Sequence, residues 1–167
     1  MKHICHISIG SNLGDRMSSI NQSIYELSRF SNIMSKSHVY ESSSWGYSDK
    51  NSYFNLVVKL KTDLNERKLM ESILKIEKSL GRERSKENRY QARTIDLDII
   101  FFGKQKFNKK NLVIPHPRAA ERDFVLYPIL DIDPFFRHPL EKKSIKVLSK
   151  ELQNKYIIKR LSYRNLI

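Results

Sequence analysis

The stretch Tyr53-Phe54-Asn55-Leu56-Val57-Val58-Lys59-Leu60-Lys61 has the clearest structural pattern in the chain. Every second residue from Phe54 to Leu60 is apolar, and this period of two is typical of a β-strand with a buried face. The period then changes to that of a helix, with apolar residues at Leu69, Ile73, Ile76 and Leu80. A strand followed directly by an amphipathic helix indicates a mixed α and β fold.

The same patterns recur on both sides of this stretch. They predict strands over residues 3–9, 32–42, 95–102 and 156–161, helices over 16–30 and 141–152, a short apolar segment over 125–132 and a basic turn over 104–110. Asp15 or Asn12 could cap the first helix, and Asp63 with Glu66 could cap the second. The order strand-helix-strand-strand-helix-strand predicts an α+β, ferredoxin-like split βαβ fold, with the helices packed on one face of a mainly antiparallel sheet.

Length and charge limit the class of protein. The chain has 167 residues, so we treat residues 1–167 as a single domain. Its net charge of +13 favours anionic partners: nucleic acid, acidic lipid or a phosphorylated small molecule. The excess is concentrated in residues 104–167, which carry +9. Cys5 is the only cysteine, which excludes an internal disulfide and a multi-cysteine zinc site. Lacking an apolar span and a signal-peptide pattern, the sequence predicts a cytoplasmic protein with no membrane partner.

The sharpest chemical feature is the pair Asp96 and Asp98 within an apolar strand. A period of two places both carboxylates on one face and the apolar residues Ile95, Leu97, Ile99 and Phe101 on the other. The two Cα atoms would then lie about 6.5–7 Å apart. Two carboxylates at this spacing can bind a hard divalent cation, and Mg²⁺ is typically held by one or two carboxylates together with phosphate oxygens. The alternative is a strand with a solvated acidic face.

Other residues could bind a phosphorylated or planar ligand. Residues 82–93 carry five basic and two acidic side chains and lead directly into the aspartate strand. Their arginines could bind phosphate, or the segment could simply be solvated. Tyr53 with Asn55 suits a planar, hydrogen-bonding heterocycle, although a half-buried strand tyrosine is equally ordinary. His116 between two prolines and Phe124 could each face a ligand or belong to the core.

Seven short stretches occur in one order and together resemble a known family. They are residues 9–15 (IGSNLGD), 45–46 (WG), 53–55 (YFN), 81–82 (GR), 93–99 (RTIDLDI), 115–118 (PHPR) and 122–126 (RDFVL). Over about residues 3 to 135 the chain resembles 6-hydroxymethyl-7,8-dihydropterin pyrophosphokinase, a family of folate biosynthesis. The run over 93–99 is the specific part of the resemblance, whereas each of the others is weak by itself.

The resemblance implies transfer of the β,γ-pyrophosphate of ATP to the pterin hydroxymethyl group, with release of AMP. It implies that Asp96 and Asp98 hold two Mg²⁺ ions and that Arg82 and Arg93 act with them in catalysis. The residues implied for the pterin are Ser43, Ser44, Trp45, Tyr53, Asn55 and Phe124, with Ser42 beside them. The residues implied for the nucleotide are Glu77, Arg84, Tyr90, Ile99, His116 and Arg122. We expect a monomer that binds ATP and the pterin but no nucleic acid.

Residues 89–93 depart from the family pattern. The family usually has Arg-Trp-Gly-Pro-Arg at this point, and this chain has RYQAR, so the resemblance does not fix the roles of Arg84, Arg89 and Tyr90. Three other functions fit part of the sequence. A split βαβ sheet with aromatic residues and a high positive charge is typical of RNA-binding modules. The aspartate pair would suit a metal-dependent nuclease, and the basic C-terminal third could bind a partner protein.

Overall fold

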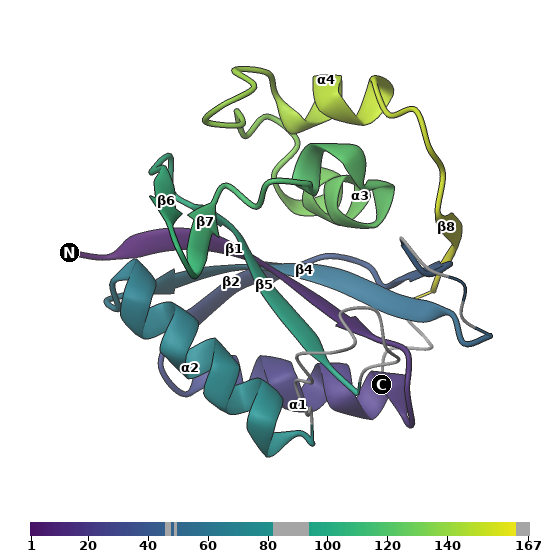
Figure 1. The fold of residues 1–167 in the computed structure, drawn as a ribbon, viewed down its shortest axis with the longest axis horizontal. Coiled ribbons are helices and arrows are strands. Elements are labelled where there is room, and N and C mark those ends of the chain that lie inside the picture. The colour runs from purple at the N-terminus through teal and green to yellow at the C-terminus, as the bar shows by residue number, and fades with distance from the viewer. Residues whose placement is uncertain (46–47, 49, 82–93, 163–167) are drawn as a thin grey trace.

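The computed structural model describes residues 1–45, 48, 50–81 and 94–162 (Figure 1). The strands are β1 (His3–Ser11), β2 (Asn32–Lys36), β3 (Tyr40–Ser42), β4 (Tyr53–Thr62), β5 (Asp96–Phe102), β6 (Phe107–Lys109), β7 (Leu112–Ile114) and β8 (Ile157–Arg160). The helices are α1 (Arg16–Ser28), α2 (Glu66–Ser79), α3 (Asp123–Ile132) and α4 (Ile145–Lys150), with a 3-10 turn at Ala119–Glu121. None of the helices within the described ranges is long and apolar enough to cross a bilayer.

The main sheet confirms the predicted fold class. Its strand order is β5-β1-β4-β3-β8, and β2 also pairs with β4. All of these pairings are antiparallel. The core between this sheet, α1 and α2 contains the predicted apolar faces of β1 and α2. It also encloses Cys5, and burial raises the pKa of its thiol to about 12, which leaves the thiol unreactive at neutral pH.

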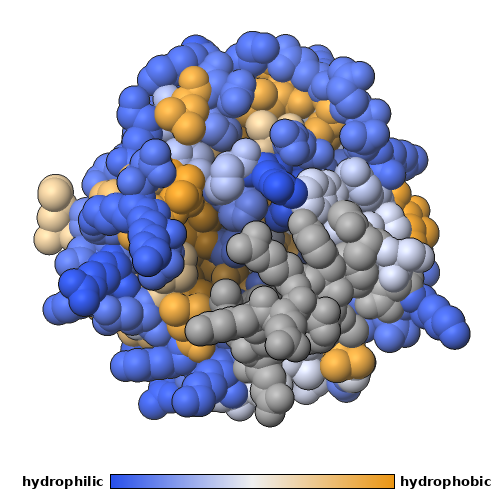
Figure 2. Space-filling model, viewed as in Figure 1, coloured by the Kyte–Doolittle hydropathy of each residue, from blue (hydrophilic) through white to orange (hydrophobic). Residues whose placement is uncertain are grey.

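The predicted placement of all helices on one face is wrong. Helices α1 and α2 cover one face of the sheet, and α3 and α4 cover the opposite face (Figure 1). The cause is a second apolar cluster on that face, in which Val57 and Phe101 pack against Val125 and Ile129 of α3. From here on, we call this side of the sheet the α3 face. Elsewhere the surface is largely hydrophilic, as Figure 2 shows for one side of the molecule.

Strand β5 does not keep a period of two along its whole length. Its pairing with β1 shifts by one residue, since His6 lies opposite Phe101 whereas Ile7 lies opposite Ile99. This bulge turns Phe101 toward the α3 face, so it does not share a face with Ile99 as predicted. Phe102 packs on the α1 and α2 side instead. The face of Asp96 and Asp98 is unaffected, because both precede the bulge.

Several predicted boundaries also change. Residues 32–42 form two strands rather than one. The Ser37 hydroxyl accepts a hydrogen bond from the backbone N–H of Val57 and so interrupts the ladder of backbone hydrogen bonds. Asp15 caps α1, but α2 is capped by Asn65, whose side chain accepts from the N–H of Lys68, and not by Asp63. Gly81, at a φ of +85°, ends α2 as predicted.

Two segments after β5 differ from prediction as well. The basic stretch predicted as a turn contains β6, which forms a hairpin with β7. The predicted helix over 141–152 is shortened at its start, where Ser144 caps α4. The preceding residues fold around His138, whose ring Nδ1 accepts from the N–H of Glu141. The late strand over 156–161 is confirmed as β8.

Candidate active site

The predicted metal and pterin residues meet along one row across the sheet. Asp96 lies opposite Gly10, Gly10 opposite Asn55, and Asn55 opposite Tyr40. Directly opposed residues of antiparallel strands point to the same face. This is the α3 face, because the Tyr40 hydroxyl donates to Asp131 of α3 at 2.9 Å. With neighbouring strands about 4.8 Å apart, the Cα atoms of Asp96 and Asn55 are separated by roughly 10 Å.

Asp96 and Asp98 lie half-buried at the start of β5, on either side of the buried Leu97. The Leu97 N–H donates to the carboxylate of Glu77, which is only 2% exposed, at 2.8 Å. Helix α2 therefore anchors the strand at the point between the two aspartates. The Ile99 side chain packs in the core below. The predicted contacts of Glu77 and Ile99 with a nucleotide remain predictions.

Arg122, just before α3, faces this acidic pair. Burial lowers the pKa of Arg122, while Asp98 and Asp96 act in the opposite direction. Its Nε is buried and has no hydrogen-bond partner within the described ranges. The guanidinium carbon lies 4.4 Å from the ring centroid of Trp45 and 5.7 Å from that of Phe124. The structure thus holds a buried arginine N–H that has no partner among the described residues, close to two aromatic rings.

His116 lies near the same end of the site, where it interacts electrostatically with Arg122 and Asp96. Its Nδ1 accepts from the N–H of Arg118 at 3.2 Å, so a neutral ring carries its proton on Nε2. Burial and the positive charge of Arg122 lower the pKa of His116 to about 4. The ring is consequently neutral at pH 7 and can donate one hydrogen bond from Nε2.

The aromatic residues border the neutral end of the site. Tyr53 lies opposite Ser42 and two residues before Asn55, so it shares the α3 face with both. Phe124 is half-buried and packs edge-on against Tyr156, with ring centroids 6.0 Å apart. Ser43 is tied to the same residue, since its N–H donates to the carbonyl of Tyr156 at 2.9 Å. The stacking of a ring between Tyr53 and Phe124 remains a prediction.

Part of the predicted site lies outside the described residues. This holds for Arg82, Arg84, Arg89, Tyr90 and Arg93, which remain predictions. No group of three or more histidine, cysteine, aspartate or glutamate side chains suited to a metal occurs in the part of the chain that the structure describes.

Two residues at the site were missed by sequence reasoning. Gly10 leaves room on the α3 face, because a Cβ at this position would lie 3.0 Å from Asn55 Oδ1. A glycine inside an alternating strand is a signal of such close approach. Arg118 places its guanidinium carbon 4.6 Å from the Trp45 ring centroid. It stands in the stretch 115–118, but nothing in its spacing predicted a contact with Trp45.

Comparison with known sequences assigns the family. Residues 6–134 match the family described as 7,8-dihydro-6-hydroxymethylpterin-pyrophosphokinase (HPPK). The chain belongs to the HPPK family. It is 38% identical to the 2-amino-4-hydroxy-6-hydroxymethyldihydropteridine pyrophosphokinase of Aquifex aeolicus, an alignment that covers 87% of this chain and 90% of the relative. It is 39% identical to the enzyme of the same name from Bacillus subtilis, over 79% of each chain.

Longer proteins also contain an HPPK-like region. The chain is 40% identical to the folic acid synthesis protein fol1 of Pneumocystis carinii but spans only 19% of its length. Among solved structures, HPPK-DHPS of Plasmodium falciparum has a similar fold, with a TM-score of 0.73 at 16% sequence identity. That match covers 90% of this chain and 43% of the Plasmodium chain. At such low identity it supports the HPPK fold alone.

Membership of the HPPK family defines the reaction. The chain is an enzyme that transfers pyrophosphate to hydroxymethyldihydropterin, a step of folate biosynthesis. The resemblance inferred from the seven short stretches is confirmed, and so is the α+β fold that it implied.

Proposed function

We propose that this transfer takes place on the α3 face, at the end of the sheet where β5 begins, with ATP as the donor. One observation carries the proposal: Asp96 and Asp98 share that face with Arg122 and His116, two strands away from Asn55. A phosphate-binding end and a heterocycle-binding end thus lie side by side. The pterin hydroxyl oxygen would bond to the β-phosphorus of ATP, the bond from that phosphorus to the α,β-bridging oxygen would break, and AMP would leave as the hydroxyl lost its proton.

The acidic pair fits Mg²⁺. Carboxylate oxygens are ligands that Mg²⁺ prefers, and this ion commonly takes only one or two of them because substrate phosphates supply the others. Asp96 and Asp98 would therefore hold the metal, and we propose two ions. When bound, the ions would neutralise charge on the transferred phosphates. Glu77 would support both carboxylates through its hydrogen bond to the intervening Leu97 N–H.

Hydrogen-bond donors near the acidic pair would bind the phosphate chain. The unpartnered Nε of Arg122 and the Nε2 proton of neutral His116 both offer donors on this face. Because His116 is uncharged at pH 7, it would orient a phosphate oxygen without competing with the metal for the aspartates. Arg82, Arg84 and Arg93 would add further positive charge, and Tyr90 would lie over the nucleotide, as the family resemblance implies.

The neutral end would bind the pterin. Its ring would stack between Tyr53 and Phe124, and the Asn55 amide would hydrogen-bond its edge. Ser43, Ser44 and Trp45 would line the pocket. Because Trp45 stacks on Arg122, the pterin end is in direct contact with the phosphate end. Catalysis would rest on placing the hydroxymethyl group next to the phosphates.

Product analysis tests this reaction. The purified chain is incubated with ATP and Mg²⁺, with and without hydroxymethyldihydropterin, and the nucleotides are separated by thin-layer chromatography. We expect AMP only in the sample that contains the pterin. ADP as product, AMP without the pterin, or the absence of any product would contradict the proposal. RNA added in place of the pterin tests the nuclease alternative, which predicts released mononucleotides.

The stacking residues are tested by binding. We expect Tyr53→Ala and Phe124→Ala each to weaken pterin binding by about tenfold or more, because each removes one stacked ring. Binding of a nonhydrolysable ATP analogue should be unchanged. Calorimetry on the protein saturated with that analogue measures the affinity for the pterin. The control is Tyr127→Ala, which removes an exposed aromatic side chain from α3, the helix that carries Phe124. Equal loss of affinity for both ligands, or no loss for either, would contradict stacking of the pterin between Tyr53 and Phe124.

A further inference from the structure

We propose that Tyr156 is a positioning residue, which holds the Phe124 ring in place for stacking. Tyr156 directly precedes β8 and lies outside residues 6–134, the part of the chain that matches the family. The inference rests on the proposed pterin site. It makes the C-terminal strand, which contains none of the seven short stretches, a structural part of that site.

The contact between the two rings suits this role. The rings of Phe124 and Tyr156 are nearly perpendicular, with an interplanar angle of 83° and centroids 6.0 Å apart. Such an edge-to-face pair is favourable and contributes beyond the apolar area that the two rings bury. A perpendicular neighbour does not take the place of a parallel, stacked ring. Tyr156 can therefore hold the Phe124 ring while a planar heterocycle stacks on it.

Phe124 needs such a neighbour because it is only half-buried. The ring packs against the apolar cluster of the α3 face on one side. The Arg122 guanidinium carbon lies 5.7 Å from its centroid, but in the proposed site that group binds phosphate. Tyr156 takes no part in the proposed binding of either substrate, so its contact can persist when both are bound. A ring that is already held in one rotamer loses less conformational entropy when the pterin binds.

The backbone of Tyr156 is fixed from two directions. Its N–H donates to the buried carboxylate of Asp123 at 2.8 Å, and the N–H of Ile157 donates to the same oxygen at 2.9 Å. Asp123 directly precedes Phe124, so these two bonds fix the segment against the start of α3. The Tyr156 carbonyl oxygen accepts from the N–H of Ser43 at 2.9 Å. Tyr156 thus connects the start of α3 with the first of the residues proposed to line the pterin pocket.

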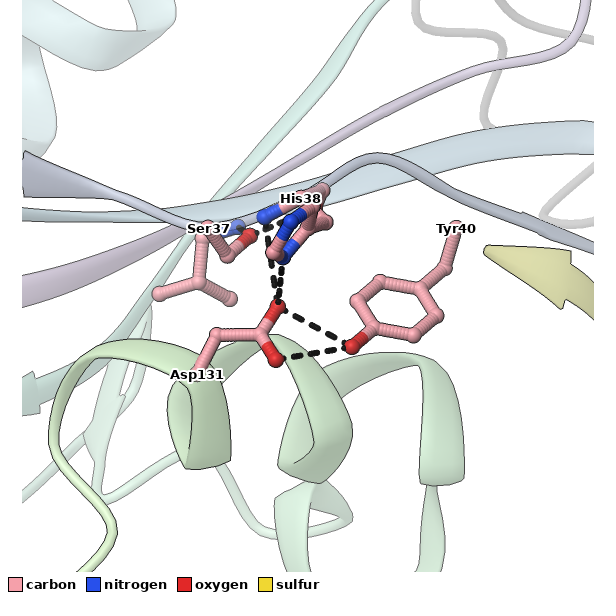
Figure 3. Close-up of polar contacts among 5 residues, drawn as sticks. Ser37, His38, Tyr40 and Asp131 are labelled. Carbon is pink, nitrogen blue, oxygen red and sulfur yellow. Dashed lines mark hydrogen bonds and ion pairs between the residues drawn. The ribbon is translucent and has the colours of Figure 1, made fainter. Parts of the chain in front are cut away.

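Strand β3 holds both α3 and β8, which keeps the two rings at a fixed distance. The Tyr40 hydroxyl donates to both carboxylate oxygens of Asp131, near the end of α3, at 2.9 and 3.0 Å. The backbone N–H of His38 donates to the same carboxylate (Figure 3). Strand β8 pairs with the other edge of β3. The helix is therefore bound to β3 near its end, and to β8 at its start through Asp123.

The test compares Tyr156→Ala with Tyr156→Phe. The first removes the ring and the second keeps it. Calorimetry on the protein saturated with a nonhydrolysable ATP analogue measures the affinity for the pterin. We expect Tyr156→Ala to weaken pterin binding about fivefold and Tyr156→Phe to stay within about twofold of wild type. Binding of the ATP analogue should be unchanged in both. The control is Ile158→Ala, which removes an exposed side chain from β8.

A double-mutant cycle tests whether Tyr156 acts through Phe124. In the Phe124→Ala background, Tyr156→Ala should change pterin affinity by less than about twofold, because the ring that it positions is absent. Steady-state AMP release of Tyr156→Ala should show a higher KM for the pterin and an unchanged KM for ATP. If Tyr156→Ala melts well below wild type, Tyr156→Leu replaces it. That variant keeps apolar volume but has no ring, and we expect the same selective loss.

The outcomes separate this inference from the function on which it rests. If Phe124→Ala binds the pterin as tightly as wild type does, the proposed pterin site fails. If Phe124→Ala weakens pterin binding and Tyr156→Ala does not, Tyr156 does not position the ring. The inference is also overturned by equal losses for both ligands, by a loss in Tyr156→Phe as large as in Tyr156→Ala, or by additive losses in the double variant.

Discussion

The α3 face of the sheet carries charged residues at both ends. At the far end, the carboxylate of Asp133, just after α3, binds His6 Nε2 at 2.9 Å and Lys59 Nζ at 2.8 Å. The hydrogen bond from His6 is the main cause that lowers the pKa of Asp133 to about 2, and Lys59 adds to it. At the site end, Arg122 keeps a buried N–H without a partner among the described residues, and its pKa is lowered by burial.

This difference separates charge used for folding from charge kept for a ligand. The cluster of His6, Lys59 and Asp133 joins β1 and β4 to the end of α3, so its attraction is realised in the folded protein itself. At the site end, burial acts against the charged forms of Arg122 and His116, so folding bears a cost there. A polyphosphate would offset that cost. A group whose charged form is disfavoured until substrate arrives is typical of functional sites.

The largest effect should come from the site-end carboxylates. We expect Asp96→Asn and Asp98→Asn each to lower turnover by about 10³-fold or more, because each removes a proposed metal ligand while the phosphate charge remains. AMP release at saturating Mg²⁺ measures the loss. Asp63→Asn, an exposed aspartate outside the site, should behave as wild type. A variant that still turns over within tenfold of wild type would remove that aspartate from the mechanism.

Filling the space at Gly10 should harm only the site end. A Cβ there would lie 3.0 Å from Asn55 Oδ1, so the amide must shift by a few tenths of an ångström. We expect Gly10→Ala to weaken pterin binding about tenfold, at roughly 1.4 kcal/mol per decade, and to leave ATP binding unchanged. Calorimetry with each ligand is the measurement. Unchanged pterin affinity would mean that the acceptor next to Gly10 is not used.

The far end should respond to acid. Asp133 has a folded-state pKa of about 2 against an ordinary 3.8, so its stabilising contribution is complete above pH 4 and is lost as the pH falls toward 2. The shift corresponds to about 2 kcal/mol. The free energy of unfolding, measured with denaturant, should therefore fall more steeply across this pH window for wild type than for Asp133→Asn. If the free energy of unfolding falls equally with pH in the two proteins, Asp133 does not bind His6 and Lys59 as described.

The smallest effect concerns His116. Its pKa, lowered to about 4 by burial and by Arg122, predicts an NMR titration midpoint far below the ordinary 6.5 in the ligand-free protein. The unfolded chain takes up this proton first, so the contribution of neutral His116 to stability is lost between about pH 6.5 and 4. Arg122→Gln should raise the midpoint. A midpoint near 6.5 in wild type would show that the ring is not buried as described.

The sequence predicted which strand faces carry the candidate site residues better than it predicted the second layer of the fold. Alternation in β4 and β5 placed Tyr53 with Asn55 and Asp96 with Asp98, because strand geometry fixes the face of each residue over a few positions. The same rule failed at Phe101, where a bulge against β1 shifts the register. Bulges depend on the partner strand, and no local pattern in β5 predicts one. The helix over 141–152 was placed on the wrong side, and α3 was predicted only as a short apolar segment, for a related reason: Val57 and Phe101 form an apolar surface on the α3 face that only the three-dimensional arrangement reveals.

Contacts between distant residues could not be predicted at all. The hydrogen bond from the Leu97 N–H to the Glu77 carboxylate joins positions that are 20 residues apart, and that between His6 and Asp133 spans 127 residues. Periodicity relates only neighbouring positions, so it contains no signal for such pairs. The roles of the arginines in residues 82–93 rest on the family resemblance alone.

The most direct test of the contrast measures stability and turnover on the same two variants at pH 7. Thermal melting and AMP release are recorded for Asp98→Asn and Asp133→Asn beside wild type. We predict that Asp98→Asn melts within about 2 °C of wild type and loses about 10³-fold in turnover. Asp133→Asn should melt about 4–8 °C lower, because it loses about 2 kcal/mol, and should keep turnover within about threefold when assayed well below its melting temperature. The separation of roles is contradicted if Asp98→Asn melts well below wild type, or if Asp133→Asn loses as much turnover as Asp98→Asn does. In either case, the charges at the two ends of the α3 face would not serve catalysis and folding separately.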